Sequence, residues 1–145
     1  MYLLDTNIVS MLDPSRHQYA PELIAWLERN GAGLYISVIT ITEMEAGIFK
    51  LRRDNKKRRA DQITGLLASI LADFADRVLP VDIETARAIA RLAAASYQNQ
   101  VALPDLIIAA TAVRHSLTVL TRNMADFGRL DVAAIDPFVA LPPEL

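Results

Sequence analysis

Short apolar runs alternate along the chain with longer segments in which apolar residues recur every three or four positions. The short runs predict five strands, in "YLL", "LYISVI", "RVLPV", "LTVLT" and "LDVAAIDP". Strands that alternate with helices are joined by right-handed crossovers, which place helices on both faces of a mainly parallel sheet. The pattern therefore predicts an α/β fold.

Helical spacing fills most of the chain between these runs. Residues 21–30 have Pro21 at a plausible first turn and Asn30-Gly31 as a stop signal, and residues 82–100 begin with an Asp cap. "DPSRHQYAP" is predicted to be a loop, and "RNMADFG" a turn with at most one helical turn. The predicted helices are a short one from Asn7, residues 21–30, a segment from Thr40, and residues 63–76, 82–100 and 103–116.

Polar residues interrupt the apolar pattern where the strands end. In parallel sheets, sites form outside the carboxyl ends of the strands. Asp5 ends the first strand, Thr121 ends "LTVLT", and Glu43 lies one helical turn beyond "LYISVI". These positions are where we expect chemistry.

Four carboxylates fall at strand tips or helix starts: Asp5, Glu43, Asp105 and Asp126. Their apolar neighbours indicate that they point inward or into a cleft. A buried carboxylate is costly unless it is paired or binds a metal, and few cations lie near these four in sequence. Oxygen ligands suit Mg²⁺ or Mn²⁺, so the pattern predicts a site for a hard cation.

Each acid also has a simpler interpretation. Asp5 is a candidate helix cap, Asp105 a first-turn acid favoured by the helix dipole, and Asp126 a turn residue. Three or four such coincidences at once are far rarer than any one of them. Convergence on one site therefore remains the leading interpretation.

Glu43 competes with Glu45 for the inward position. Residues two apart on a helix lie about 200° apart, so at most one of the two faces a cleft. Gly47, four residues after Glu43, leaves room beside that side chain. This favours Glu43 as the inward acid and leaves Glu45 in solvent.

The composition is that of a globular protein. The 145 residues, 52% hydrophobic and 22% charged, predict one domain over 1–145. No apolar run reaches the length of a membrane span, and no secretory signal pattern opens the chain, so we expect a cytoplasmic protein. The absence of cysteine excludes disulfides, thiolate catalysis and Cys-type zinc sites.

Charge is unevenly spread, although the net charge is only −2. Residues 50–59, "KLRRDNKKRR", hold seven of the fifteen basic residues and one of the seventeen acidic ones, and the rest of the chain has a balance of −8. Such a run is either a solvated helix end or a surface that attracts a polyanion. Both interpretations stay open.

Other chemistries have little support. His17 and His115 are far apart and form no HExxH motif, and there is neither a nucleophile elbow nor a Gly-rich phosphate loop. A metal-dependent phosphatase is disfavoured because "DTN" lacks the second Asp of a DxD loop.

Taken in order, the motifs resemble those of the PIN-domain family. They are "LLDTNIVS" with Asp5, "ISVITITEMEAGI" with Glu43, and "LPDLIIAATAVRHSLTVLTRNMADFGRL" with Asp105 and Asp126, followed by a short strand. The chain most resembles the VapC-like toxins of bacterial toxin–antitoxin pairs, including the FitB-type subgroup. The resemblance covers Met1 to Pro137.

The resemblance implies a metal-dependent endoribonuclease with a three-layer α/β/α fold. Asp5, Glu43 and Asp105 match the family's main metal-binding residues. Many members carry an acid where this chain has Asn123, so Asp126 or the Thr121 hydroxyl must complete the site. The expected helpers of the four acids are Thr6, Asn7, Thr121 and Asn123, of which Thr6 and Asn7 brace Asp5 and start the next helix.

The resemblance also implies partners: an RNA substrate, a cognate VapB-like antitoxin that offers an Arg to the acids, a second copy in a homodimer, and DNA only through the antitoxin. RNA contacts from the basic run are expected of Arg52, Arg53, Lys56, Lys57, Arg58 and Arg59. Because Asn123 replaces the usual acid, a second hypothesis is a catalytically weak PIN-like partner of a DNA-binding antitoxin. Whether one or two ions bind stays open.

Overall fold

A parallel sheet of five strands forms the centre of the molecule. The computed structural model describes residues 1–145, apart from the side chain of Asn99. The strand order is β3-β2-β1-β4-β5, and every pairing is parallel. The α/β prediction is confirmed, and a strand forms within each predicted run. The strands are β1 (Tyr2–Leu4), β2 (Leu34–Ser37), β3 (Val78–Leu79), β4 (Thr118–Leu120) and β5 (Ala134–Ile135).

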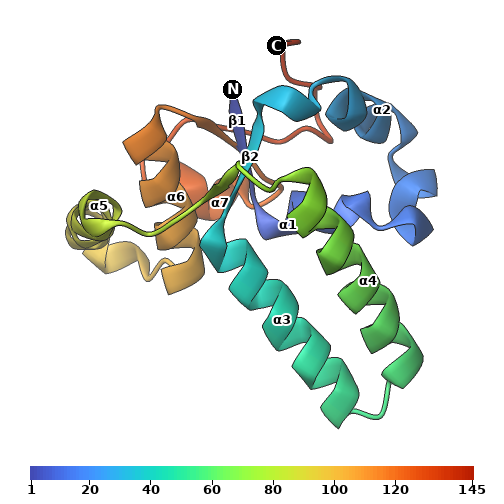
Figure 1. The fold of residues 1–145 in the computed structure, drawn as a ribbon. Coiled ribbons are helices and arrows are strands. Elements are labelled where there is room, and N and C mark those ends of the chain that lie inside the picture. The colour runs from blue at the N-terminus through green and yellow to red at the C-terminus, as the bar shows by residue number, and fades with distance from the viewer.

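Helices connect the strands and cover both faces of the sheet (Figure 1). The α-helices are α1 (Thr6–Val9), α2 (Pro21–Arg29), α3 (Val38–Arg53), α4 (Lys57–Asp73), α5 (Ile83–Ala95), α6 (Leu103–His115) and α7 (Met124–Arg129). Single turns of 3₁₀-helix are η1 (Ser10–Leu12), η3 (Gly31–Gly33) and η4 (Tyr97–Asn99), and η2 (Pro14–Tyr19) is longer. Helices α3 and α4 form a long hairpin that projects from the sheet (Figure 1). Among the described residues, no helix is both long and apolar enough to cross a lipid bilayer.

Two local predictions were wrong because a side chain caps the start of a helix at each of these places. "DPSRHQYAP" is not a loop, because the Asp13 carboxylate accepts hydrogen bonds from the backbone N–H and the hydroxyl of Ser15, at 3.0 and 2.8 Å, and starts η2. The strand in "LYISVI" ends at Ser37, whose Oγ lies 3.4 Å from the N–H of Ile39 and caps α3. The helix after β2 therefore begins two residues earlier than predicted.

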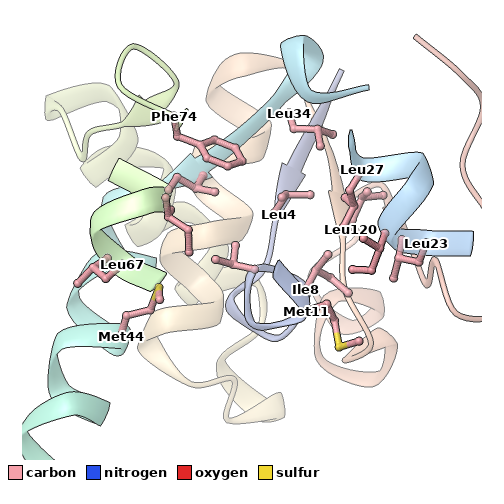
Figure 2. Packing of buried hydrophobic residues seen from close by; sticks show 14 of the residues in the cluster. Leu4, Ile8, Met11, Leu23, Leu27, Leu34, Met44, Leu67, Phe74 and Leu120 are labelled. Atoms are coloured by element: carbon pink, nitrogen blue, oxygen red, sulfur yellow. The ribbon is translucent and has the colours of Figure 1, made fainter. Parts of the chain in front are cut away.

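Alternate residues of the central strands supply two hydrophobic cores, one on each face. On one face, Leu4, Leu34 and Leu120 are 2% exposed or less and pack with α1, α2 and α4 (Figure 2). On the other face, Leu3 and Val119 are fully buried against α6 and α7. The result is a three-layer α/β/α arrangement, in which the carboxyl edge of the sheet lies between the two helical layers.

Candidate active site

Asp5 and Thr121 leave the sheet side by side at its carboxyl edge. The register of β1 and β4 pairs Leu4 with Leu120, so the residue after each strand lies next to the other. Thr121 Oγ1 donates a hydrogen bond to Asp5 Oδ2 at 2.6 Å, and both residues are buried. Asp5 precedes α1, but its side chain makes no capping hydrogen bond. Asp5 therefore occupies the N-cap position of α1, but its carboxylate does not serve as the cap.

Asn7 holds the Asp5 carboxylate from the first turn of α1. Its amide Nδ2 donates to Asp5 Oδ2 and lies 3.3 Å from Thr121 Oγ1. Its Oδ1 accepts a hydrogen bond from the backbone N–H of Arg122 at 3.2 Å. Asn7 thus joins the ends of β1 and β4 and fixes the direction of the carboxylate.

Glu43 approaches this edge from the second turn of α3. It is partly buried, and Thr6 Oγ1 donates to Glu43 Oε2 while lying 3.3 Å from Thr40 Oγ1. Glu45 is exposed, so Glu43 is the inward acid, as predicted. Gly47 is not what makes room for Glu43, contrary to the prediction, because a Cβ built at Gly47 would meet no atom within 4 Å.

Asn123 links the two remaining acids. Asp105 lies in the first turn of α6 and Asp126 in the first turn of α7. Asn123 Nδ2 donates to Asp126 Oδ2 at 2.8 Å and lies 3.3 Å from Asp105 Oδ2. Its backbone N–H donates to Thr121 Oγ1 at 2.9 Å. Because Thr121 also donates to Asp5, these hydrogen bonds connect Asn123 to Asp5 as well.

The four carboxylates share one electrostatic field. Burial and, to a smaller extent, neighbouring carboxylates together raise the pKa of Asp105 to about 6. These neighbours are Asp5, Asp126 and Glu43, in order of effect. Burial also raises the pKa of Asp5, against the opposing effect of the hydrogen bond from Thr121. The structure thus brings all four predicted acids together.

One cation reaches this group among the ion pairs of the described residues. Arg129 Nη1 lies 3.0 Å from Asp126 Oδ1, one turn along α7. The excess of carboxylate charge therefore remains uncompensated by the protein. A site of this kind favours the binding of external cations.

The donor set fits a divalent cation such as Mg²⁺ or Mn²⁺, because it offers carboxylate oxygens from four positions with amide and hydroxyl groups behind them. As the side chains lie, no three of the described Asp, Glu and His residues are arranged to hold one ion. Ionised carboxylates repel one another, and an ion between them would replace that repulsion by attraction. Binding therefore requires the acids to draw together around it.

The basic run lies apart from the acids, at the tip of the α3–α4 hairpin (Figure 1). Glu43 and Arg53 are ten positions apart on α3, which corresponds to about 15 Å of helix. Arg59 pairs with the buried Asp13 at 2.6 Å and ties α4 to η2, and Arg52 lies 3.7 Å from Asp61. The other four predicted RNA contacts, Arg53, Lys56, Lys57 and Arg58, are exposed.

Three residues next to the acids were missed in the sequence. Thr40 contacts Thr6, Arg129 pairs with Asp126, and Arg122 donates its N–H to Asn7. Helical spacing was a usable signal for two of them, because Thr40 lies three residues before Glu43 and Arg129 three after Asp126. The contact of Arg122 depends on strand pairing and has no local signal.

A family model for the PIN domain matches residues 2–133. The chain belongs to the PIN-domain family. It is 38% identical over 141 residues to Toxin FitB of Neisseria gonorrhoeae, a match that covers 95% of this chain and 99% of FitB. It is 33% identical to VapC ribonuclease Y4jK of Sinorhizobium fredii, and the match covers 95% of this chain and 98% of Y4jK. This PIN-domain chain is thus a member of the VapC- and FitB-like ribonuclease toxins, as the motifs predicted.

Solved structures of PIN-domain relatives share the fold. FitAcB from Neisseria gonorrhoeae superposes with a TM-score of 0.79 at 35% identity, covering 95% of this chain and 99% of that one. The structure of FitAB bound to an IR36 DNA fragment superposes with a TM-score of 0.71 at 35% identity, and the match covers 95% of this chain and 96% of that one. A toxin–antitoxin complex from Klebsiella pneumoniae superposes with a TM-score of 0.62 at 28% identity, and the match covers 100% of both chains. The predicted PIN-like fold class is confirmed.

Proposed function

We propose that this PIN-domain protein hydrolyses RNA phosphodiester bonds with Mg²⁺ or Mn²⁺ held by Asp5, Glu43, Asp105 and Asp126. The observation that carries the proposal is the set of hydrogen bonds that holds the four carboxylates at the carboxyl edge of the sheet. Cleavage of RNA by the purified protein with and without divalent metal tests it. The relatives named as ribonucleases support the choice of RNA as substrate.

The four acids would hold the cation, which when bound supplies charge neutralisation at the phosphate and acidifies a water molecule. The polar groups behind the acids supply orientation. Thr121 and Asn7 fix Asp5, and Thr6 fixes Glu43. These contacts limit how far each carboxylate can turn, so that the acids, once drawn together around the cation, would stay in place as charge develops in the transition state.

Asp105 is the acid most strongly affected by the others. Without metal, burial and the neighbouring carboxylates raise its pKa to about 6. A divalent cation bound among the acids would replace this repulsion by attraction and favour the charged carboxylate. We assign Asp105 the role of a metal ligand.

Asn123 is a positioning residue for two of the acids. We expect Asn123→Ala to lower kcat/KM for RNA cleavage by about 10- to 100-fold, the usual effect of losing a group that orients metal ligands. The metal concentration for half-maximal activity should rise as well, because Asp105 and Asp126 lose their shared donor. Titration of cleavage with Mg²⁺ measures both, and a variant with unchanged kinetics would contradict this role.

The exposed end of the basic run is proposed to hold the RNA backbone. Replacing Lys56 and Lys57 by glutamine should weaken RNA binding and flatten the plot of log Kd against log salt by about 1.4, since each phosphate contact to a single strand contributes about 0.7. Fluorescence anisotropy at several salt concentrations measures the slope. Arg87→Gln, which removes an exposed charge on α5, should leave it unchanged. An unchanged slope in the double variant would mean that the run is only solvated.

We further propose that the chain acts in the cytoplasm as one domain over residues 1–145, held inactive by a VapB-like antitoxin that also makes the DNA contacts. The toxin–antitoxin complex from Klebsiella pneumoniae and the DNA-bound FitAB assembly support such partners. A homodimer is part of the proposal. The Ala-rich helix α5 packs on α6 and buries Ala88 there, so its exposed side alone is open to a second copy.

A further inference from the structure

A groove with a mixed polar and apolar lining lies beside the tail that follows β5. It has a volume of about 400 Å³ and is lined by residues 19–23, at the start of α2, and residues 137–141. Two of the lining residues are aromatic: Tyr19 is 72% exposed and Phe138 is 37% exposed. Accessible aromatic rings in a groove offer surfaces on which a flat ring can stack.

Arg122 connects this groove to the acids. It lies between Thr121 and Asn123, which hold Asp5 and Asp105, and its backbone N–H donates to Asn7. Its guanidinium carbon lies 4.7 Å from the centre of the Phe138 ring. A positive charge thus lies beside an aromatic ring of the groove, on the segment that also carries Thr121 and Asn123.

The wall formed by the tail is fixed in place from both ends. Near β5, the Asp136 carboxylate accepts the N–H of Phe138 at 2.9 Å. Beyond the groove, the buried Asn30 donates to Glu144 Oε2 at 2.6 Å and accepts the N–H of Leu145 at 2.9 Å. The tail cannot close over the groove without breaking these contacts, so the space is formed before any ligand arrives.

We propose that the groove binds an unpaired base of the RNA strand next to the scissile phosphate, while Arg122 contacts the backbone between them. This inference rests on the proposed function and adds a specificity subsite to it. Single-stranded RNA is recognised by stacking of splayed bases on aromatic rings and guanidinium planes, combined with phosphate contacts from cations. Tyr19 and Phe138 supply the aromatic rings, and Arg122, which lies over the ring of Phe138, supplies the guanidinium plane and the positive charge.

The test uses an RNA oligonucleotide that the purified protein cuts, together with versions in which each nucleotide near the cut is made abasic in turn. We expect kcat/KM of the unmodified protein to fall about tenfold at one abasic position, within the range measured for one stacked base. Phe138→Leu keeps an apolar side chain but removes the ring. This variant should lose about tenfold on the intact RNA and nothing further at that abasic position.

Two controls separate stacking from a loss of structure. Tyr19→Ala should behave like Phe138→Leu, whereas Tyr97→Ala removes an 84% exposed ring elsewhere and should match the unmodified protein. Melting temperatures of all variants should agree within a few degrees. Groove variants that cleave every RNA like the unmodified protein would overturn the inference, as would equal losses at all abasic positions.

Two further outcomes distinguish failure of the proposed function from failure of the subsite alone. If the unmodified protein cuts no RNA with Mg²⁺ or Mn²⁺, the proposed function fails and the subsite with it. If the groove variants cleave normally but escape inhibition by the antitoxin, the groove holds a segment of the antitoxin, and the RNA subsite is overturned while the proposed function stands.

Discussion

Replacing Asp105 by asparagine should abolish RNA cleavage and raise the melting temperature of the metal-free protein. Asparagine keeps the shape of the side chain but removes the charge with which Asp105 would bind the metal. We expect kcat/KM to fall by roughly a thousandfold or more, since the lost interactions together stabilise the transition state by several kcal/mol. An initial-rate assay on a cleavable RNA measures this loss.

The gain in stability follows from the field at Asp105. In the folded protein its pKa is about 6, above the ordinary value of 3.8, because burial and the other carboxylates disfavour the charged form. Above pH 6 the folded state must therefore keep a charge that the unfolded state carries at lower cost. After allowance for solvent screening, the relief amounts to about 1 to 2 kcal/mol, or roughly 3 to 8 °C in melting temperature.

The raised pKa of Asp105 makes the stability of the metal-free protein depend on pH. Between pH 3.8 and about 6 the folded protein binds a proton at Asp105 that the unfolded chain has released. The contribution of Asp105 to stability is therefore complete at low pH and is lost as pH rises through 6. Thermal unfolding without metal should show this fall in the unmodified protein and a smaller fall in Asp105→Asn, in which Asp5 still contributes because its pKa is also raised.

Asp131→Asn is the matched control, because Asp131 is an exposed acid outside the cluster. It should change neither cleavage nor the shape of the pH profile. If Asp105→Asn keeps substantial activity, or melts at the same temperature as the unmodified protein at pH 8, the assignment of Asp105 to the cluster is wrong.

The second large effect is expected from a pair of substitutions on one helix. Glu43→Gln should lower kcat/KM by about a hundredfold or more, because the neutral amide cannot replace a carboxylate ligand although it still accepts the hydrogen bond from Thr6. Glu45→Gln should leave the rate unchanged. Glu45 is exposed and lies about 200° around the helix from Glu43.

The comparison of these two variants is informative because they remove the same charge from the same helix, two residues apart. General electrostatic effects on RNA binding act on both. Equal losses in the two variants would therefore show that α3 contributes only its overall charge, and that Glu43 holds no ion.

Much of the architecture is predictable because local patterns determine it. Buried strands such as "YLL" are short and continuously apolar, and Asp82 caps α5 where the sequence places an Asp cap. The inward direction of Glu43 follows from helical geometry. Where prediction failed, at η2 and at the end of β2, a side chain of Asp13 or Ser37 capped a helix in place of a loop or a longer strand.

The contacts that organise the site come from pairings distant in sequence. Thr121 reaches Asp5 because β4 lies beside β1, and Asn123 reaches Asp105 because α6 and α7 meet at the same edge. The pairing of Arg59 with Asp13 removes a basic residue from the expected RNA surface in the same way. No local pattern encodes which of several nearby elements a side chain will meet.

The most direct test is cleavage of a mixed RNA pool by the purified protein, freed of any antitoxin, with Mg²⁺ or Mn²⁺ and with EDTA, beside Asp5→Ala. Folding of both proteins is checked by circular dichroism. Our account predicts cleavage that requires metal and disappears in Asp5→Ala. Cleavage that survives EDTA or the loss of Asp5, or no cleavage at all by folded, metal-supplied protein, would contradict it, and the last result would favour a PIN-domain partner of the antitoxin with little nuclease activity.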